Sequence, residues 1–95
     1  ELPESKSALL ASVRASSEAQ LWLWTLAPGD SYAAEPDPAG WHEMVYIIEG
    51  TLTLTQSGQS QDYPPGSFAV YPSDQSYSYA NQGQVQLRFV RNVVS

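Results

Sequence analysis

The sequence predicts an all-β domain with little or no helix, folded as a closed sandwich or barrel. Short runs alternate between apolar and polar side chains, whereas a helical repeat of apolar residues is missing. Turn residues interrupt these runs about every 8–12 residues, a spacing typical of all-β sandwiches and barrels. The chain has 95 residues, of which 42% are hydrophobic, and this length supports one core but not two. We therefore expect a single β-domain.

Eight segments carry the strand pattern: 8–15, 20–27, 43–49, 51–56, 59–63, 67–71, 76–80 and 84–92. The breaks between most of them contain Gly, Pro or Asn, the residues that supply the backbone angles of tight turns. The segment 35–41 is too rich in Pro and Gly to form a strand. We expect an ordered loop there.

Two of the predicted strands have informative faces. In the segment 20–27, both tryptophans fall on one face, and Leu21 and Leu23 fall on the other. The segment 43–49 is apolar on both faces between its end carboxylates. An apolar face that does not point into the core is a candidate contact surface for a second subunit.

The charge distribution excludes several kinds of partner. Ten acidic residues face four basic ones, and no Lys or Arg occurs between residues 15 and 87. Nucleic-acid binding requires a cationic surface that replaces counterions along the phosphates, and anionic lipid surfaces also attract basic segments. We therefore expect no contact of this segment with nucleic acid and none with a membrane. The absence of Cys excludes disulfides, zinc fingers and a thiol nucleophile.

Three stretches carry a resemblance to a known family. They are LWLWTLAPGDSY at 21–32, WHEMVYIIEGTLTL at 41–54 and DYPPGSFAVYPSDQSYSYAN at 62–81. Together they resemble the two-motif signature of the cupin superfamily. The first stretch is similar to the C-terminal cupin domain of bacterial helix-turn-helix regulators of the XRE type. The resemblance implies a double-stranded β-helix, or jelly-roll barrel, that senses a small molecule while a separate N-terminal domain binds DNA. It also implies a homodimer, in agreement with the apolar outer face of 43–49.

The resemblance also implies how the chain is organised. We expect a single cupin domain over 1–95, with its core in residues 20–95 and an N-terminal strand region at 1–19. The only methionine is Met44, so we expect the chain to be part of a longer protein. The DNA-binding domain of the regulator would then be absent from this chain.

Metal-binding cupins hold a divalent metal with two or three His and one Glu, and most of these ligands are missing here. In the alignment that the resemblance implies, Glu43 keeps the place of the Glu, whereas Asp37 and Tyr77 stand where His is expected. His42 is the only imidazole, and strand alternation points it away from the face of its neighbour Glu43. We therefore predict no cofactor. A divalent metal, if bound, would use Asp37, His42 and Glu43.

The same positions predict a ligand site. The resemblance aims Asp37 and Glu43 into the barrel and places Trp41 on the loop at the mouth of the pocket. Tyr77 and Tyr79 share one face because they are two residues apart. A pocket lined by two acids and no base favours an ammonium group over an anion. We expect a small polar metabolite, amine-like or amino-acid-like, bound by these five residues.

These observations lead to a sensing domain rather than an enzyme. No Ser lies in a G-x-S-x-G context, and the glycine loop that holds phosphates is missing. Two alternatives stay open. One is a metal-dependent cupin enzyme, either an oxygenase or an isomerase, and the other is a structural dimerisation domain with a collapsed pocket. The regulator interpretation predicts a cytoplasmic protein.

Overall fold

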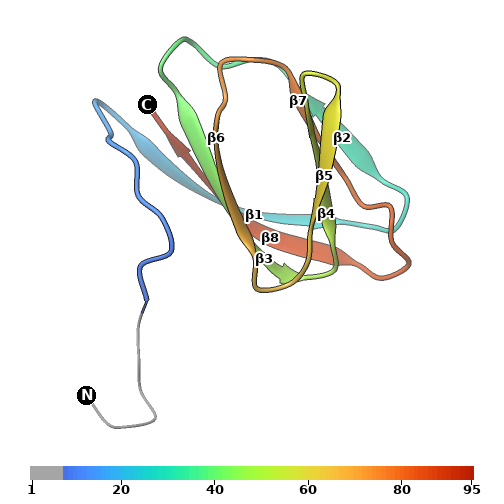
Figure 1. The fold of residues 1–95 in the computed structure, drawn as a ribbon. Coiled ribbons are helices and arrows are strands. Elements are labelled where there is room, and N and C mark those ends of the chain that lie inside the picture. The colour runs from blue at the N-terminus through green and yellow to red at the C-terminus, as the bar shows by residue number, and fades with distance from the viewer. Residues whose placement is uncertain (1–7) are drawn as a thin grey trace, which may run out of the picture.

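The chain folds into two antiparallel β-sheets that pack face to face (Figure 1). The computed structural model describes residues 8–95. One sheet contains, in spatial order, β1 (Ala19–Leu26), β8 (Leu87–Val94), β3 (His42–Glu49) and β6 (Phe68–Pro72). The other contains β2 (Ser31–Ala34), β7 (Tyr77–Ala80), β4 (Leu52–Gln56) and β5 (Gln59–Tyr63). Strands are the only regular elements of the described residues, so the all-β prediction is confirmed. None of these residues belongs to a helix that is long and apolar enough to cross a membrane.

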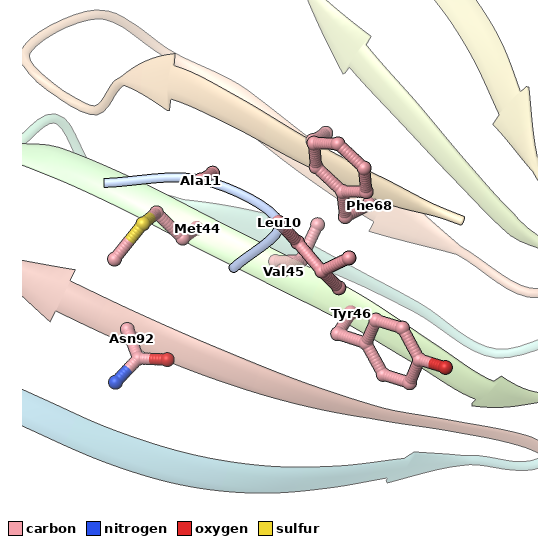
Figure 2. Close-up of a pocket in the computed structure, with 8 residues that line it drawn as sticks. Leu10, Ala11, Met44, Val45, Tyr46, Phe68 and Asn92 are labelled. Carbon is pink, nitrogen blue, oxygen red and sulfur yellow. The ribbon is translucent and has the colours of Figure 1, made fainter. Parts of the chain in front are cut away.

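Most of the predicted strands are confirmed, but the strand predicted at 8–15 is wrong. The segment pairs with no strand. Figure 2 shows Leu10 and Ala11 across the outer face of β3, where they line a cavity of about 170 Å³ with Tyr46 and Phe68. Its apolar residues therefore pack on the face of the sheet instead of extending an edge. Residues 1–7 of the predicted N-terminal strand region lie outside the described residues.

Strand β2 was not predicted from the sequence. It has only four residues, two of them alanines, and alanine is depleted in strands. It forms because its edge pairs with β7, where Tyr32 lies opposite Tyr79. The segment 35–41, which follows it, has no strand, so the predicted loop is confirmed.

The apolar interior follows from the alternation of side chains along each strand. On β8, Leu87 and Phe89 point between the sheets and are fully buried. On β1, Leu21 and Leu23 are 74% and 61% exposed on the outer face, which confirms the predicted parity, and Trp24 packs on the core. The other members of the core are Leu26, Val45, Ile47, Leu52, Leu54, Ala69, Tyr71, Tyr77 and Tyr79.

Two residues hold the loops together at the apolar end of this core. Gly50 has a φ of +75°, and a Cβ there would lie 2.5 Å from the Gln86 carbonyl oxygen. Only glycine fits that approach without a backbone shift. The side-chain amide of Asn81 donates to the carbonyls of Leu26, at 3.0 Å, and Val85, at 2.8 Å. Asn81 therefore joins the end of β1 to the loop that precedes β8.

Candidate functional site

A polar cavity of about 340 Å³ lies between the two sheets. Its walls come from β1, β2, β3, β7 and β8 and from the loop after β2. The lining residues are Gln20, Tyr32, Ala33, Ala34, Glu35, Asp37, Trp41, Glu43, Tyr77, Arg91 and Val93. Charged groups of both signs therefore face one space inside the sandwich.

Glu43 is the most deeply buried charged side chain of this site, with 1% of its surface exposed. It lies on the inner face of β3, opposite Tyr71 of β6 and Val93 of β8. The hydroxyls of Tyr71 and Tyr79 donate to Oε1, the former at 2.7 Å, and the hydroxyl of Tyr77 donates to Oε2. A buried carboxylate needs such donors, because it loses its hydration on folding.

The three tyrosines of this cluster are held as hydrogen-bond donors. Burial is the main cause that raises the pKa of the hydroxyls of Tyr71, Tyr77 and Tyr79 well above the usual value. The negative charge of Glu43 raises the pKa of each one further. The oxygens of Tyr71 and Tyr79 also lie 2.8 Å apart. The hydroxyls therefore stay protonated at neutral pH and fix the orientation of the carboxylate.

Asp37 faces the cavity from the loop after β2. Its backbone N–H donates to the carbonyl of Ser73 at 2.8 Å, and the N–H of Ser73 donates to the carbonyl of Trp41 at 2.9 Å. These two bonds hold the loop against the end of β6. The Asp37 atom Oδ2 is buried and has no hydrogen-bond partner in the described structure. One carboxylate oxygen of this cavity-lining residue is therefore left without a hydrogen bond.

The expectation of a cavity without a base is wrong, because Arg91 lines it from the inner face of β8. The side chain is 8% exposed. Leu87 and Phe89 point inward, and the same alternation carries Arg91 inward two residues later. The count of basic residues between 15 and 87 missed this residue, whereas the parity of the last strand would have found it.

The structure brings four of the five predicted ligand residues to the cavity: Asp37, Trp41, Glu43 and Tyr77. Tyr79 is fully buried behind them and reaches the site through its bond to Glu43. Sequence reasoning missed Tyr71, whose position two residues after the buried Ala69 indicates the same inner face.

The donor set does not fit the histidine-rich metal site that the resemblance implies. His42 begins β3, its Nδ1 lies 3.2 Å from the carbonyl oxygen of Gly40, and it does not line the cavity. Both oxygens of Glu43 are engaged by tyrosines. Within residues 8–95, no group of three or more His, Asp or Glu side chains is placed to hold a metal ion. We derive no step through a metal.

Two facing antiparallel sheets with a polar cavity between them define the double-stranded β-helix class. A family model described as a cupin domain matches residues 22–93, so the chain belongs to the cupin family. The fold predicted from the sequence motifs is therefore confirmed.

Solved structures with the same fold include two transcriptional regulators and a predicted oxalate decarboxylase. The cupin domain of an XRE family transcriptional regulator from Enterobacter cloacae is 23% identical, with a TM-score of 0.79 and coverage of 81% of each chain. An HTH_3 family transcriptional regulator from Vibrio cholerae is 21% identical, with a TM-score of 0.76, over 81% of this chain and 43% of that one. A predicted oxalate decarboxylase from Thermotoga maritima is 24% identical, with a TM-score of 0.68, over 78% of this chain and 64% of that one. A search of curated proteins finds no match.

These likenesses confirm the predicted resemblance to the cupin domains of XRE-type regulators at the level of the fold. The shared fold does not define an activity, because one fold hosts many functions and each function depends on its site.

Proposed function

We propose that this domain binds a small-molecule effector for a bacterial transcriptional regulator and is not a catalyst. The observation that carries the proposal is the polar cavity, into which Asp37, Glu43 and Arg91 bring charged groups. The likeness in fold to the cupin domain of one bacterial regulator and to part of a second regulator supports it. The DNA-binding domain would lie outside this chain, and the role places the protein in the cytoplasm.

The size of the cavity favours a sensor over a purely structural domain. Small-molecule sites occupy about 300–1,000 Å³, and this cavity has about 340 Å³. A structural dimerisation domain would gain stability if apolar side chains filled this space. Buried atoms without partners, such as Oδ2 of Asp37, cost free energy unless a ligand or a bound water satisfies them.

The donor arrangement favours a sensor over a metal-dependent oxygenase or isomerase. Such an enzyme needs a metal with an open coordination position. In this domain Glu43, which keeps the place of the expected Glu ligand, accepts bonds from three tyrosines. A bound effector would instead extend this hydrogen-bond network, with Tyr77 and Asp37 in contact with it.

Regulation requires that the effector bind one state of the protein more tightly than another. We infer that the two states are arrangements of a homodimer, formed through the outer face of the β1-β8-β3-β6 sheet. Leu23, Tyr46 and Phe68 lie in one register across this face and each stays at least 40% exposed, although Leu10 packs beside Tyr46 and Phe68. A change at this interface would alter the spacing of the attached DNA-binding domains.

A metabolite screen by thermal shift tests the sensing role. A ligand at 100 times its dissociation constant adds about 2.7 kcal/mol, which raises the Tm of a domain of this size by roughly 10–20 °C. We expect at least one organic metabolite to do so, and Tyr77→Phe to weaken it. A screen without any binder would overturn the proposal, and stoichiometric metal in the purified protein, measured by elemental analysis, would favour the enzyme.

Sedimentation equilibrium at micromolar concentration tests the dimer. We expect Tyr46→Lys to produce monomers, because it puts a charge at the centre of the apolar face. Val85→Lys is the matched control, since Val85 is also exposed but lies in the loop before β8. A wild-type protein that sediments only as a monomer contradicts the proposed interface.

A further inference from the structure

The cavity contains one base that no hydrogen bond satisfies fully. The Nε atom of Arg91 is buried and has no hydrogen-bond partner among the described residues. The side chain is 8% exposed and lines the cavity. A buried N–H of a charged group without an acceptor costs more free energy than a neutral one. Arg91 therefore lines the cavity with a guanidinium that has at least one unused donor.

Two tryptophans hold the guanidinium in place without using its donors. The Cζ atom of Arg91 lies 5.2 Å from the ring centroids of Trp22 and of Trp24. The indole N–H of Trp22 donates to Oε1 of Gln20 at 3.0 Å, which fixes that ring. Contacts with aromatic faces stabilise a cation but accept no conventional hydrogen bond. The N–H groups at the edge of the guanidinium can therefore still donate hydrogen bonds to a planar acceptor such as a carboxylate.

The positive charge of Arg91 persists in this environment. Burial alone would lower its pKa, but the neighbouring oxygens of Tyr79 and Glu43 outweigh it, and the pKa of Arg91 is raised. Glu43 itself is occupied by three tyrosine hydroxyls. Its negative charge therefore stabilises the guanidinium, while its own oxygens accept from the tyrosines.

A complementary acceptor faces the same cavity. Oδ2 of Asp37 is buried without a partner, and the loop that carries it is tied to Ser73. Trp41 and Tyr32 add aromatic surface to the lining. The cavity thus offers a fixed cation, an unpartnered carboxylate oxygen and an aromatic wall, within a volume of about 340 Å³.

We propose that the effector is a small amino acid in its zwitterionic form, with its carboxylate bound by Arg91 and its ammonium group bound by Asp37. The inference rests on the proposed effector-binding function and specifies the ligand of that site. It replaces the simple preference for ammonium compounds, because an amine without a carboxylate leaves Arg91 unsatisfied. The aromatic wall would contact the side chain of the amino acid.

The first experiment compares ligands that differ by one charged group. The twenty L-amino acids, β-alanine and γ-aminobutyrate are screened by thermal shift and calorimetry together with sugars and nucleosides. For the tightest amino acid, the decarboxylated amine and the deaminated acid are then measured. We expect each to bind about 100-fold more weakly, because each leaves one buried charged partner unsatisfied.

The outcomes separate the inference from the function on which it rests. If the decarboxylated amine or the deaminated acid binds as tightly as the amino acid, the proposal of a zwitterionic effector is wrong. Binding of only a sugar or a nucleoside overturns it as well but leaves the effector-binding function intact. A complete panel without binding overturns the effector-binding function itself.

The second experiment removes the charge of Arg91 and of Asp37 in separate variants. Arg91→Gln is expected to lose about 100-fold in affinity for the amino acid but little for its decarboxylated amine. Asp37→Asn is expected to show the opposite preference, a loss with the amino acid but little with the deaminated acid. Arg88→Gln, on the outer face of the same strand, and Asp30→Asn, in an exposed turn, are the matched controls and should bind as the wild type does.

The crossed pattern distinguishes recognition from loss of fold, because a misfolded variant would lose the truncated ligands too. If Arg91→Gln does not fold, Arg91→Lys retains the charge without the planar fork, and we expect it to bind the amino acid about tenfold more weakly. Wild-type affinity of either folded Arg91 variant for the amino acid would overturn the assignment.

Discussion

The space between the sheets has two ends of opposite chemistry, although the same strands build both. On the inner face of β3, Glu43 stands at one end and Ile47 at the other. On β8, Arg91 lies near the first end and Leu87 near the second. One end is a network of hydroxyls and charges around a cavity, and the other is closely packed with aliphatic side chains.

The difference indicates how the domain divides stability from binding. Burial of apolar surface stabilises a fold in proportion to the area removed from water. Buried charges with good partners contribute little net stability, because the loss of hydration offsets most of the attraction. The apolar end should therefore carry most of the folding free energy, and the polar end can be specialised for a ligand.

The largest expected effect concerns the apolar end. Phe89→Ala should lower the free energy of unfolding by about 4 kcal/mol, because it removes a fully buried ring that packs on Trp24 and Tyr79. Urea unfolding followed by circular dichroism measures the change. Val85→Ala, in which an exposed side chain in the loop before β8 is truncated, is the control and should cost about 0.5 kcal/mol or less. Equal losses of unfolding free energy in the two variants would contradict the conclusion that the apolar end carries most of the stability.

An effect of similar size is expected at the polar end, but only at alkaline pH. Burial raises the pKa of Tyr71, Tyr77 and Tyr79 above the ordinary tyrosine value of 10.0, so the folded state keeps protons that the unfolded state releases. Their contribution to stability is complete below pH 10 and decreases as pH rises above it. Each hydroxyl should cost about 1.4 kcal/mol at one pH unit above the unfolded pKa.

Urea unfolding at pH 9, 10 and 11, with tyrosinate absorbance as a second signal, measures this loss. Tyr77→Phe should lose less stability between pH 9 and pH 11 than the wild type, by about the 1.4 kcal/mol of one hydroxyl. A free energy of unfolding that is the same at pH 9 and pH 11 would show that the folded state does not retain these protons.

Most of the fold could be predicted from the sequence, because local alternation and turn residues specify strands that have a buried face. The two errors share a physical origin. The alternation at 8–15 has no strand edge to pair with, so its Leu10 packs on a sheet face instead. The four residues of β2 carry almost no local signal and are extended only because β7 lies beside them. Pairing is a property of the assembled sheet, and a short segment does not encode it alone.

The candidate site could be predicted only in part. The residues in the motifs were found, whereas a residue identified only by the face of its strand was missed. Asp37, Glu43 and Tyr77 were indicated by the cupin motifs and do line one cavity. Arg91 was missed because a count of charges along the chain says nothing about which face of a strand carries them. The absence of a partner for its Nε atom, on which the ligand inference depends, is visible only in three dimensions.

A smaller effect is expected at the junction between the two sheets. Asn81→Ala should cost about 2 kcal/mol, because the buried carbonyls of Leu26 and Val85 lose their donor. Thermal unfolding measures the change. Asn92→Ala is the matched control, because the side chain of Asn92 makes only a long hydrogen bond of 3.5 Å to the carbonyl of Gln20. The free energy of unfolding of this variant should stay within about 0.5 kcal/mol of the wild type.

The smallest effect should come from the most deeply buried charge. Glu43→Gln keeps the shape of the side chain and removes its charge, so weaker bonds from the tyrosines are offset by a smaller loss of hydration, and we expect about 1 kcal/mol. Glu49→Gln, exposed at the end of the same strand, should change nothing. Effector affinity of Glu43→Gln should nevertheless fall, because Tyr77 loses its fixed orientation. A loss of stability as large as that of Phe89→Ala would mean that the hydroxyl network also holds the sheets together, and the two ends would then differ in chemistry but not in role.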